Sequence, residues 1–195
     1  MTAVAQADSR GPERTRQRLL DEACRLFALH SFAGTSLQMI ADTLGVTKAA
    51  IYHHFKTRDE ILTAVIQPAI DELRAVIAVA QAQRTAAARA DAMLSGMVDL
   101  TVRHRALIGM IGMDAGVTNA LQSHPDIVEL IQRPAELMRL DGSPGAEINA
   151  TIALAGIATA ASSPVLQHHD QDVLRDLMLA AGRRVLGLRT RRAAS

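Results

Sequence analysis

Two short stretches of helical periodicity, residues 37–44 and 48–55, lie only three residues apart in this chain. Gly45 allows a tight left-handed turn after the first stretch, and Thr47 can cap a helix over the second. The apolar positions follow three-to-four spacing and are expected to be core: Leu37, Ile40, Ala41, Leu44, Ile51 and Phe55. Two short helices joined by so tight a turn predict a helix-turn-helix.

Further helices are predicted on both sides of this motif. An apolar face at helical spacing predicts a first helix over residues 13–29, and Thr35 or Ser36 can cap the second. After the motif, Thr57 and Glu60 are spaced as a capping box, which begins a fourth helix. Strong helix formers are abundant and the alternating pattern of strands is hard to find, so the chain is predicted to be all-α.

The composition favours a folded cytoplasmic protein. Hydrophobic residues make up 49% of the 195 residues, which is enough to form a core. The single cysteine, Cys24, excludes an internal disulfide framework and fits a reducing cytosol. The first ten residues are polar, so no signal peptide is expected. The uncharged run 148–167 contains Asn, Thr, Ser and Pro, so it is interpreted as a buried helix rather than a membrane span.

Charge and aromatic residues divide the chain into two modules. Residues 1–58 hold eight Arg or Lys and five Asp or Glu, whereas the whole chain has a formal net charge of only +1. All four aromatic residues also lie in this part. We therefore predict a basic module over residues 1–58, with a flexible arm at about 1–12, and a larger module over 59–195. The alternative for the first module is a three-helix structural subdomain without a ligand.

An ordered set of motifs runs through residues 15–62. It consists of Leu-Leu, Ala-Cys and Leu-Phe in the first helix, Thr-Ser before Ile40-Ala41, Gly45-Val46-Thr47-Lys48, and Ile51-Tyr52-His53-His54-Phe55-Lys56. This set, roughly the first third of the chain, resembles the DNA-binding domain of the TetR family of bacterial repressors. The resemblance implies an N-terminal three-helix helix-turn-helix domain and a C-terminal helical ligand-binding and dimerisation domain. Ser31 and Ala49 depart from it, because the family usually has Gly at the first position and often at the second.

The resemblance places the third helix in the major groove of DNA. DNA binding needs donors and cations for the phosphates and side chains that reach the base edges. The residues expected to contact DNA are Ser36, Gln38, Thr47, Lys48, Ala49, Tyr52, His53, His54, Lys56 and Arg58.

Different roles are expected within this set. Lys48 would donate to guanine, and Ala49 and Tyr52 would contact thymine methyl groups. Tyr52, the hydroxyls of Ser36 and Thr47, and the side chains of His54, Lys56 and Arg58 would bind phosphates, and His53 a base or sugar. Gln38 has two interpretations, a base contact or the Glu/Gln position of a capping box that starts at Thr35. Arg10, Arg14 and Arg16 form either an arm over the DNA or a solvated tail.

Metal binding and catalysis are not supported by the sequence. Adjacent residues on a helix point about 100° apart, so His53 and His54 do not chelate as an i, i+4 pair does. The pair His168-His169 fails in the same way, and nearby Asp170 and Asp172 leave it a weak candidate. There is no phosphate loop, nucleophile elbow or HExxH motif, so no enzyme activity and no cofactor are expected.

The larger module is predicted to be a helical dimerisation domain. The expected helices cover residues 59–83, 85–103, 105–115, 125–140, 144–161 and 170–188. The last two, 144–161 and 170–188, are rich in Ala and Gly, which lets helices approach closely in a four-helix bundle between two copies. Packing within one copy is the alternative explanation. Pro68 lies inside the helix that links the modules and is expected to be a hinge, a static kink or a break between two helices.

An effector pocket in the larger module is predicted only in outline. This module contains no Phe, Tyr or Trp, so a small apolar or acyl-type effector suits it better than a flat aromatic one. The residues expected to line it are Met97, His104, Met110, Met113 and Asn119, with Met93, Asp114 and Gln122 as further candidates. Methionines at helical spacing are also typical of an ordinary core.

Together these features predict a homodimeric cytoplasmic repressor that a small molecule releases from a palindromic DNA operator. The alternative from another class is a helical small-molecule-binding or catalytic protein whose basic module is only structural. The sequence also leaves an activator, or a regulator without an effector, as open alternatives.

Overall fold

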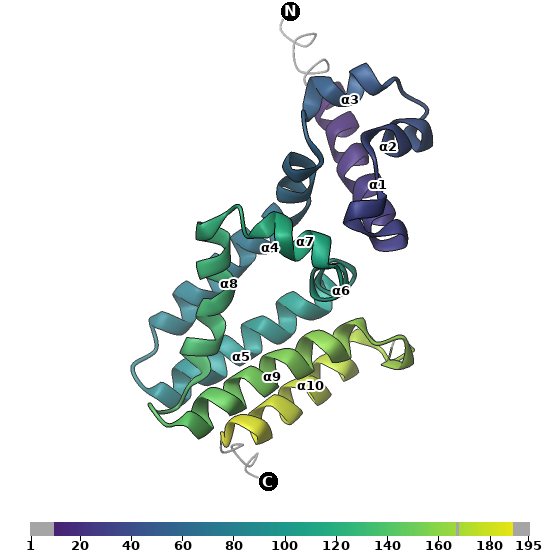
Figure 1. Ribbon diagram of the computed structural model, residues 1–195. Coiled ribbons are helices and arrows are strands. Elements are labelled where there is room, and N and C mark those ends of the chain that lie inside the picture. Colours follow the sequence, from purple (N-terminus) through teal and green to yellow (C-terminus); the bar gives the residue numbers. More distant parts are fainter. Residues whose placement is uncertain (1–9, 167, 189–195) are drawn as a thin grey trace, which may run out of the picture. The chain divides into compact units, whose positions relative to one another are not determined.

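The computed structural model describes residues 10–166 and 168–188. All the regular structure within these residues is helical (Figure 1). The helices are α1 (Arg10–Gly34), α2 (Leu37–Leu44), α3 (Lys48–His54), α4 (Arg58–Gln81), α5 (Ala86–Arg103), α6 (Arg105–Met113), α7 (Ala115–Leu121), α8 (Pro125–Met138), α9 (Pro144–Ser162) and α10 (Gln171–Leu186), with the 3-10 turn η1 (Pro164–Leu166). The all-α prediction is confirmed. None of the described helices is long and apolar enough to cross a membrane.

The chain divides into two compact units. The first unit contains the residues up to Pro68 and the segment Asp114–Ala120, and the second contains Ala69–Met113 and the residues from Leu121 on. The boundary predicted between residues 58 and 59 therefore falls too early. The first turns of α4 belong to the first unit because Ile61, Leu62 and Ile66 are fully buried there. No sequence pattern indicates that Asp114–Ala120 belongs with this unit.

The first unit is built around α1, α2 and α3. Its core contains Leu19 and Phe27 of α1, Ile40 of α2 and Ile51 of α3, each 1% exposed or less. α1 packs against α2, and α2 against α3. Burial raises the pKa of the Cys24 thiol on α1, with a smaller contribution from the negative charge of Asp21. A thiol in such surroundings is less reactive.

α1 is longer than predicted and is kinked near its end. It begins at Arg10, so residues 10–12 of the predicted arm are helical, and residues 1–9 lie outside the described part. The backbone leaves the helical region at Ser31 (φ 64°, ψ 163°) and then continues to Gly34. The predicted helix end near Ser31 is therefore a kink.

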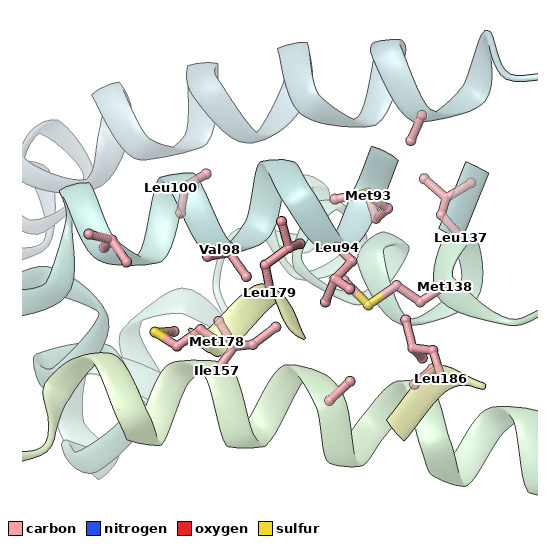
Figure 2. Packing of buried hydrophobic residues seen from close by; sticks show 14 of the residues in the cluster. Met93, Leu94, Val98, Leu100, Leu137, Met138, Ile157, Met178, Leu179 and Leu186 are labelled. Carbon is pink, nitrogen blue, oxygen red and sulfur yellow. The ribbon is translucent and has the colours of Figure 1, made fainter. Parts of the chain in front are cut away.

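The second unit is a bundle in which α5 packs against α8, α9 and α10. Figure 2 shows side chains of these helices pointing into one core, among them Leu94, Val98, Met138, Ile157 and Leu179. Two arginines of α10 also bind aspartates of α5: Arg183 donates to Asp91 at 2.6 and 3.0 Å, and Arg175 to Asp99. These ion pairs fix the register of α10 along α5.

Most helix boundaries in the larger module agree with the sequence prediction to within two residues. Thr85, Ser143 and Asp170 are the N-caps of α5, α9 and α10. α7 was not predicted. Its apolar residues continue the pattern of α6, and a single polar residue, Asp114, separates the two helices.

Candidate nucleic-acid interface

The helix-turn-helix is held by caps on both of its helices. The Ser36 hydroxyl accepts from the Met39 N–H at 3.1 Å, and the Thr47 hydroxyl accepts from the Ala50 N–H at 3.2 Å. Between the helices, Gly45 takes the left-handed conformation (φ 67°) and its N–H donates to carbonyls of the last turn of α2. Gly at this position avoids the steric cost of a Cβ atom.

α3 is anchored on one side and exposed on the other. Ile51 and the C-cap residue Phe55 are buried, with exposures of 1% and 5%. Lys48, Ala49, Tyr52 and His53 are all exposed, and the Lys48 ammonium lies 5.7 Å from the centre of the Tyr52 ring. The cation and the ring attract each other. The structure therefore brings four of the predicted residues onto the free side of one short helix.

Two of the predicted hydroxyls act as caps and still have a proton to donate. A hydroxyl that accepts one hydrogen bond can donate another. Ser36 and Thr47 are both exposed, so their caps do not prevent a bond to a phosphate.

Gln38 of α2 is exposed, and its amide nitrogen donates to the Asp42 carboxylate at 2.7 Å. Because a carboxylate only accepts hydrogen bonds, the amide oxygen of Gln38 takes no part in this contact. The capping-box interpretation of Gln38 is wrong. The N-cap is Ser36, and the Thr35 hydroxyl is buried and donates to the carbonyls of Leu26 and Ser31.

The two adjacent histidines have different surroundings. His53 is exposed, whereas His54 is half-buried. His54 lines a hollow of about 40 Å³ together with Arg18 and Leu19 of α1 and Val46 of the turn. The ring centres of the two histidines lie 5.3 Å apart in an edge-to-face arrangement.

The start of α4 is capped by its own residues. The Thr57 hydroxyl accepts from the Glu60 N–H at 3.1 Å. The Glu60 carboxylate accepts in turn from the Lys56 N–H at 2.8 Å, one residue before the N–H that a standard capping box uses. The Lys56 side chain is exposed.

Arg58 has a different role from the one that the sequence predicts. Its guanidinium donates to the carbonyls of Phe32, Ala33 and Thr35 at 3.0, 3.0 and 2.6 Å. It also lies 5.1 Å from the centre of the Phe32 ring. These bonds join the start of α4 to the end of α1, so we do not place Arg58 among the residues that bind phosphate. The contact spans more than twenty residues of sequence, and no local pattern indicates it.

Arg16 of the predicted arm also has a partner within the unit. Its guanidinium lies 5.2 Å from the centre of the Phe55 ring. Arg14 is exposed on α1, and the side chain of Arg10 lies outside the described part.

The five residues predicted to line an effector pocket are not brought together in one unit. Asn119 belongs to the first unit, whereas Met97, His104 and Met110 belong to the second. Met97 packs against the core, Met110 is buried, and the His104 imidazole lies 2.8 Å from the Glu72 carboxylate. The side chain of Met113 lies outside the described part. A hollow of about 240 Å³ in the second unit is lined by other residues, including Met138, Asp141 and Asn149.

Comparisons with known proteins agree with this geometry. Residues 19–65, which include α2 and α3, match the family described as bacterial regulatory proteins, tetR family. The regulator AcrR of Shigella flexneri is 39% identical over 62 residues, which are 32% of this chain and 29% of the relative. This segment is therefore similar to the corresponding region of TetR-family regulators. The repressor KstR2 of Rhodococcus jostii is 32% identical over 73 residues, which are 37% of this chain and 36% of the relative.

Solved TetR-family structures share the fold over most of this chain. The ketosteroid transcriptional regulator KstR2 of Mycobacterium tuberculosis superimposes with a TM-score of 0.70 at 16% identity, over 89% of this chain and 93% of that one. A transcriptional regulator from Aquifex aeolicus gives a TM-score of 0.63 at 18% identity, over 88% of this chain and 99% of that one. The sequence matches to the curated relatives span only about a third of those proteins, and the relatives are named as transcriptional regulators or repressors.

Proposed function

We propose that this chain is a homodimeric cytoplasmic repressor that leaves a palindromic DNA operator when a small-molecule effector binds. The observation that carries the proposal is the exposed side of α3. Lys48, Ala49, Tyr52 and His53 lie there on a helix held by the Thr47 cap and by buried Ile51. A helix that is anchored to the core on one side and exposed on the other can enter a major groove without a rearrangement of the protein.

The side chains of this surface divide into base-reading and phosphate-binding groups. Lys48 suits the O6 and N7 acceptors of guanine, and Ala49 and Tyr52 suit thymine methyl groups. The amide oxygen of exposed Gln38, which is not used in the bond to Asp42, suits the amino group of adenine or cytosine. Ser36, Thr47, Tyr52, His54 and Lys56 supply phosphate contacts, and His53 reaches a base or a sugar.

Dimerisation is supported by the outer side of α9 and α10. α9 is apolar on its buried side, where Ala153 and Ile157 lie, and its exposed Ile148 and Ile152 keep 57% and 52% of their surface. On α10, Val173 and Leu177 are 50% and 58% exposed. Two copies joined through these helices would present two α3 helices to successive turns of one face of DNA, about 34 Å apart.

The effector is proposed to be apolar, of the acyl or aliphatic type. The second unit has no Phe, Tyr or Trp for stacking, and its hydrophobic core consists of Leu, Ile, Val, Met and Ala. Of the residues predicted to line its pocket, Met97, His104 and Met110 belong to the second unit and stay the proposed lining residues.

Selection of bound DNA from a random pool tests the function directly. The full chain is expected to enrich a palindrome whose half-sites are about 10 base pairs apart. Lys48→Ala should lose affinity for that sequence, while Arg84→Ala, which removes an exposed positive charge of the second unit, should not. Failure to enrich any sequence would favour the alternative, a helical ligand-binding or catalytic protein with a structural basic module.

A further inference from the structure

The end of α1 is a strained segment at the base of the DNA-binding surface. We call residues 31–35 the α1 corner. Ser31 has a positive φ of 64° with ψ of 163°, a backbone conformation that residues other than Gly rarely adopt. Such a conformation persists only when its surroundings hold it. α2 begins directly after the corner, with Ser36 as its cap.

The corner is held by a carboxylate that is remote in sequence. One oxygen of Asp114 accepts from the backbone N–H of Phe32, 82 residues away. The other accepts from the N–H groups of Gly116 and Val117 at 2.8 and 3.4 Å and so caps α7. Asp114 thus ties the corner to α7 with both of its oxygens.

A second observation shows that α7 is built to lie against the corner. A Cβ atom added to Gly116 would lie 3.0 Å from the Asp114 carboxylate and 3.4 Å from the Ala33 nitrogen. Val117 of the same helix is completely buried. The segment Asp114–Ala120 is accordingly part of the first unit, although the residues before and after it belong to the second.

The corner determines where α2 starts. Arg58 binds the carbonyls of Phe32, Ala33 and Thr35, and Asp114 binds the Phe32 N–H. Movement of this segment would displace Ser36 and Gln38, and it would displace α3 through the α2–α3 packing.

We propose that Asp114 is a positioning residue for DNA binding, because its bond to the Phe32 N–H holds the α1 corner and thereby α2 and α3 in the arrangement that fits DNA. The inference rests on the proposed function. It gives residues 114–120 a part in DNA binding, although they lie outside the segment that resembles DNA-binding domains.

The chain offers a closely matched control at Asp170. One oxygen of Asp170 accepts from the N–H groups of Asp172 and Val173 at 2.9 and 3.4 Å, almost the same cap as that of Asp114. Asn is as good an N-cap as Asp, so Asp170→Asn keeps its cap. In Asp114→Asn the side chain keeps only one acceptor oxygen. Its NH2 group is a donor and cannot accept from a second backbone N–H. The same substitution therefore breaks one of the two bonds that tie α7 to the corner at Asp114 and breaks no such tie at Asp170.

The test measures the affinity of the full-length dimeric variants for the operator that the wild-type chain selects, together with hydrogen exchange of the Phe32 amide. Asp114→Asn is expected to weaken binding by about tenfold, the loss that corresponds to one hydrogen bond to a charged group. It should also speed exchange at Phe32. Asp170→Asn should stay within about twofold of wild type in affinity. Equal affinities of the two variants would overturn the inference.

A second matched pair decides the question if Asp114→Asn does not fold. Gly116→Ala adds a Cβ atom 3.0 Å from the Asp114 carboxylate and so crowds the group that binds the corner, whereas Gly112→Ala on α6 adds a Cβ atom that meets nothing within 4 Å. Weaker DNA binding by Gly116→Ala alone supports the inference, and equal binding by both refutes it. If the wild-type chain selects no DNA, the proposed function fails and the inference falls with it, so the two failures are distinguishable.

Discussion

At the scale of single residues, Ser31 is the clearest case of local strain. Its positive φ favours glycine, and its hydroxyl partly compensates by accepting from the Gly34 N–H at 3.1 Å. Ser31→Gly is expected to stabilise the protein by about 0.5–1 kcal/mol, because relief of strain exceeds the lost hydrogen bond and the added flexibility of the unfolded chain. Ser31→Ala keeps the strain and loses the bond, so it should destabilise. Chemical denaturation measures the free energy of unfolding of both variants. If Ser31→Ala is more stable than Ser31→Gly, Ser31 is not strained.

Ala49 is expected to influence which bases the protein prefers in its operator. Its methyl group is exposed on α3 beside Lys48, where it would meet the base edges. Ala49→Gly should change the ranking of operator variants, because it removes a contact to a thymine methyl group. Ala50→Gly is the matched control, since it carries the same cost in helix propensity and Ala50 lines the hollow beside α1 instead. The measurement is selection of bound DNA with both variants. An unchanged ranking of operator variants in Ala49→Gly would show that Ala49 does not contribute to base preference.

At the scale of elements, Pro68 lies inside α4, at the last residue of the first unit. A proline within a helix removes one backbone hydrogen bond and costs about 3 kcal/mol in a regular helix. The break between two helices that the sequence left open is wrong, because α4 continues from Arg58 to Gln81. A hinge and a static kink remain to be distinguished.

Pro68→Ala should stiffen α4 if Pro68 is a hinge. We expect changed operator affinity and a reduced response to the effector, both measured by titration of labelled operator DNA. An increase in stability without any change in affinity or response would identify a static kink.

Elements with local signals were predictable from the sequence, and those that depend on distant contacts were not. Ser36, Thr47, Thr85, Ser143 and Asp170 cap the helices that follow them, as hydrogen bonding within four residues dictates. The sequence predicts Arg58 to be a surface cation, because the carbonyls that it binds lie more than twenty residues away in the sequence. The packing of α7 against the end of α1 has no local signal either, since it depends on Asp114, Gly116 and Ala33.

At the scale of the whole molecule, two copies are needed to bind a palindrome. Ile152→Glu combined with Leu177→Glu places charges on the exposed apolar sides of α9 and α10, which a dimer would bury. The double variant is expected to be monomeric in sedimentation and to bind operator DNA far more weakly. Val79→Glu on α4, where the side chain is 58% exposed, is the control and should stay dimeric. A dimeric double variant would place the interface elsewhere.

We propose that α3 and its flanking residues bind the phosphates and bases of DNA. The most direct measurement is the affinity for the selected operator as a function of salt concentration, in the wild type and in Lys56→Ala. We predict that log K falls steeply with log salt, by about 0.9 for each phosphate contact, and that Lys56→Ala reduces the slope by about one for each protomer. Weak binding that depends neither on DNA sequence nor on salt concentration, with the same slope in Lys56→Ala, would contradict this role of α3.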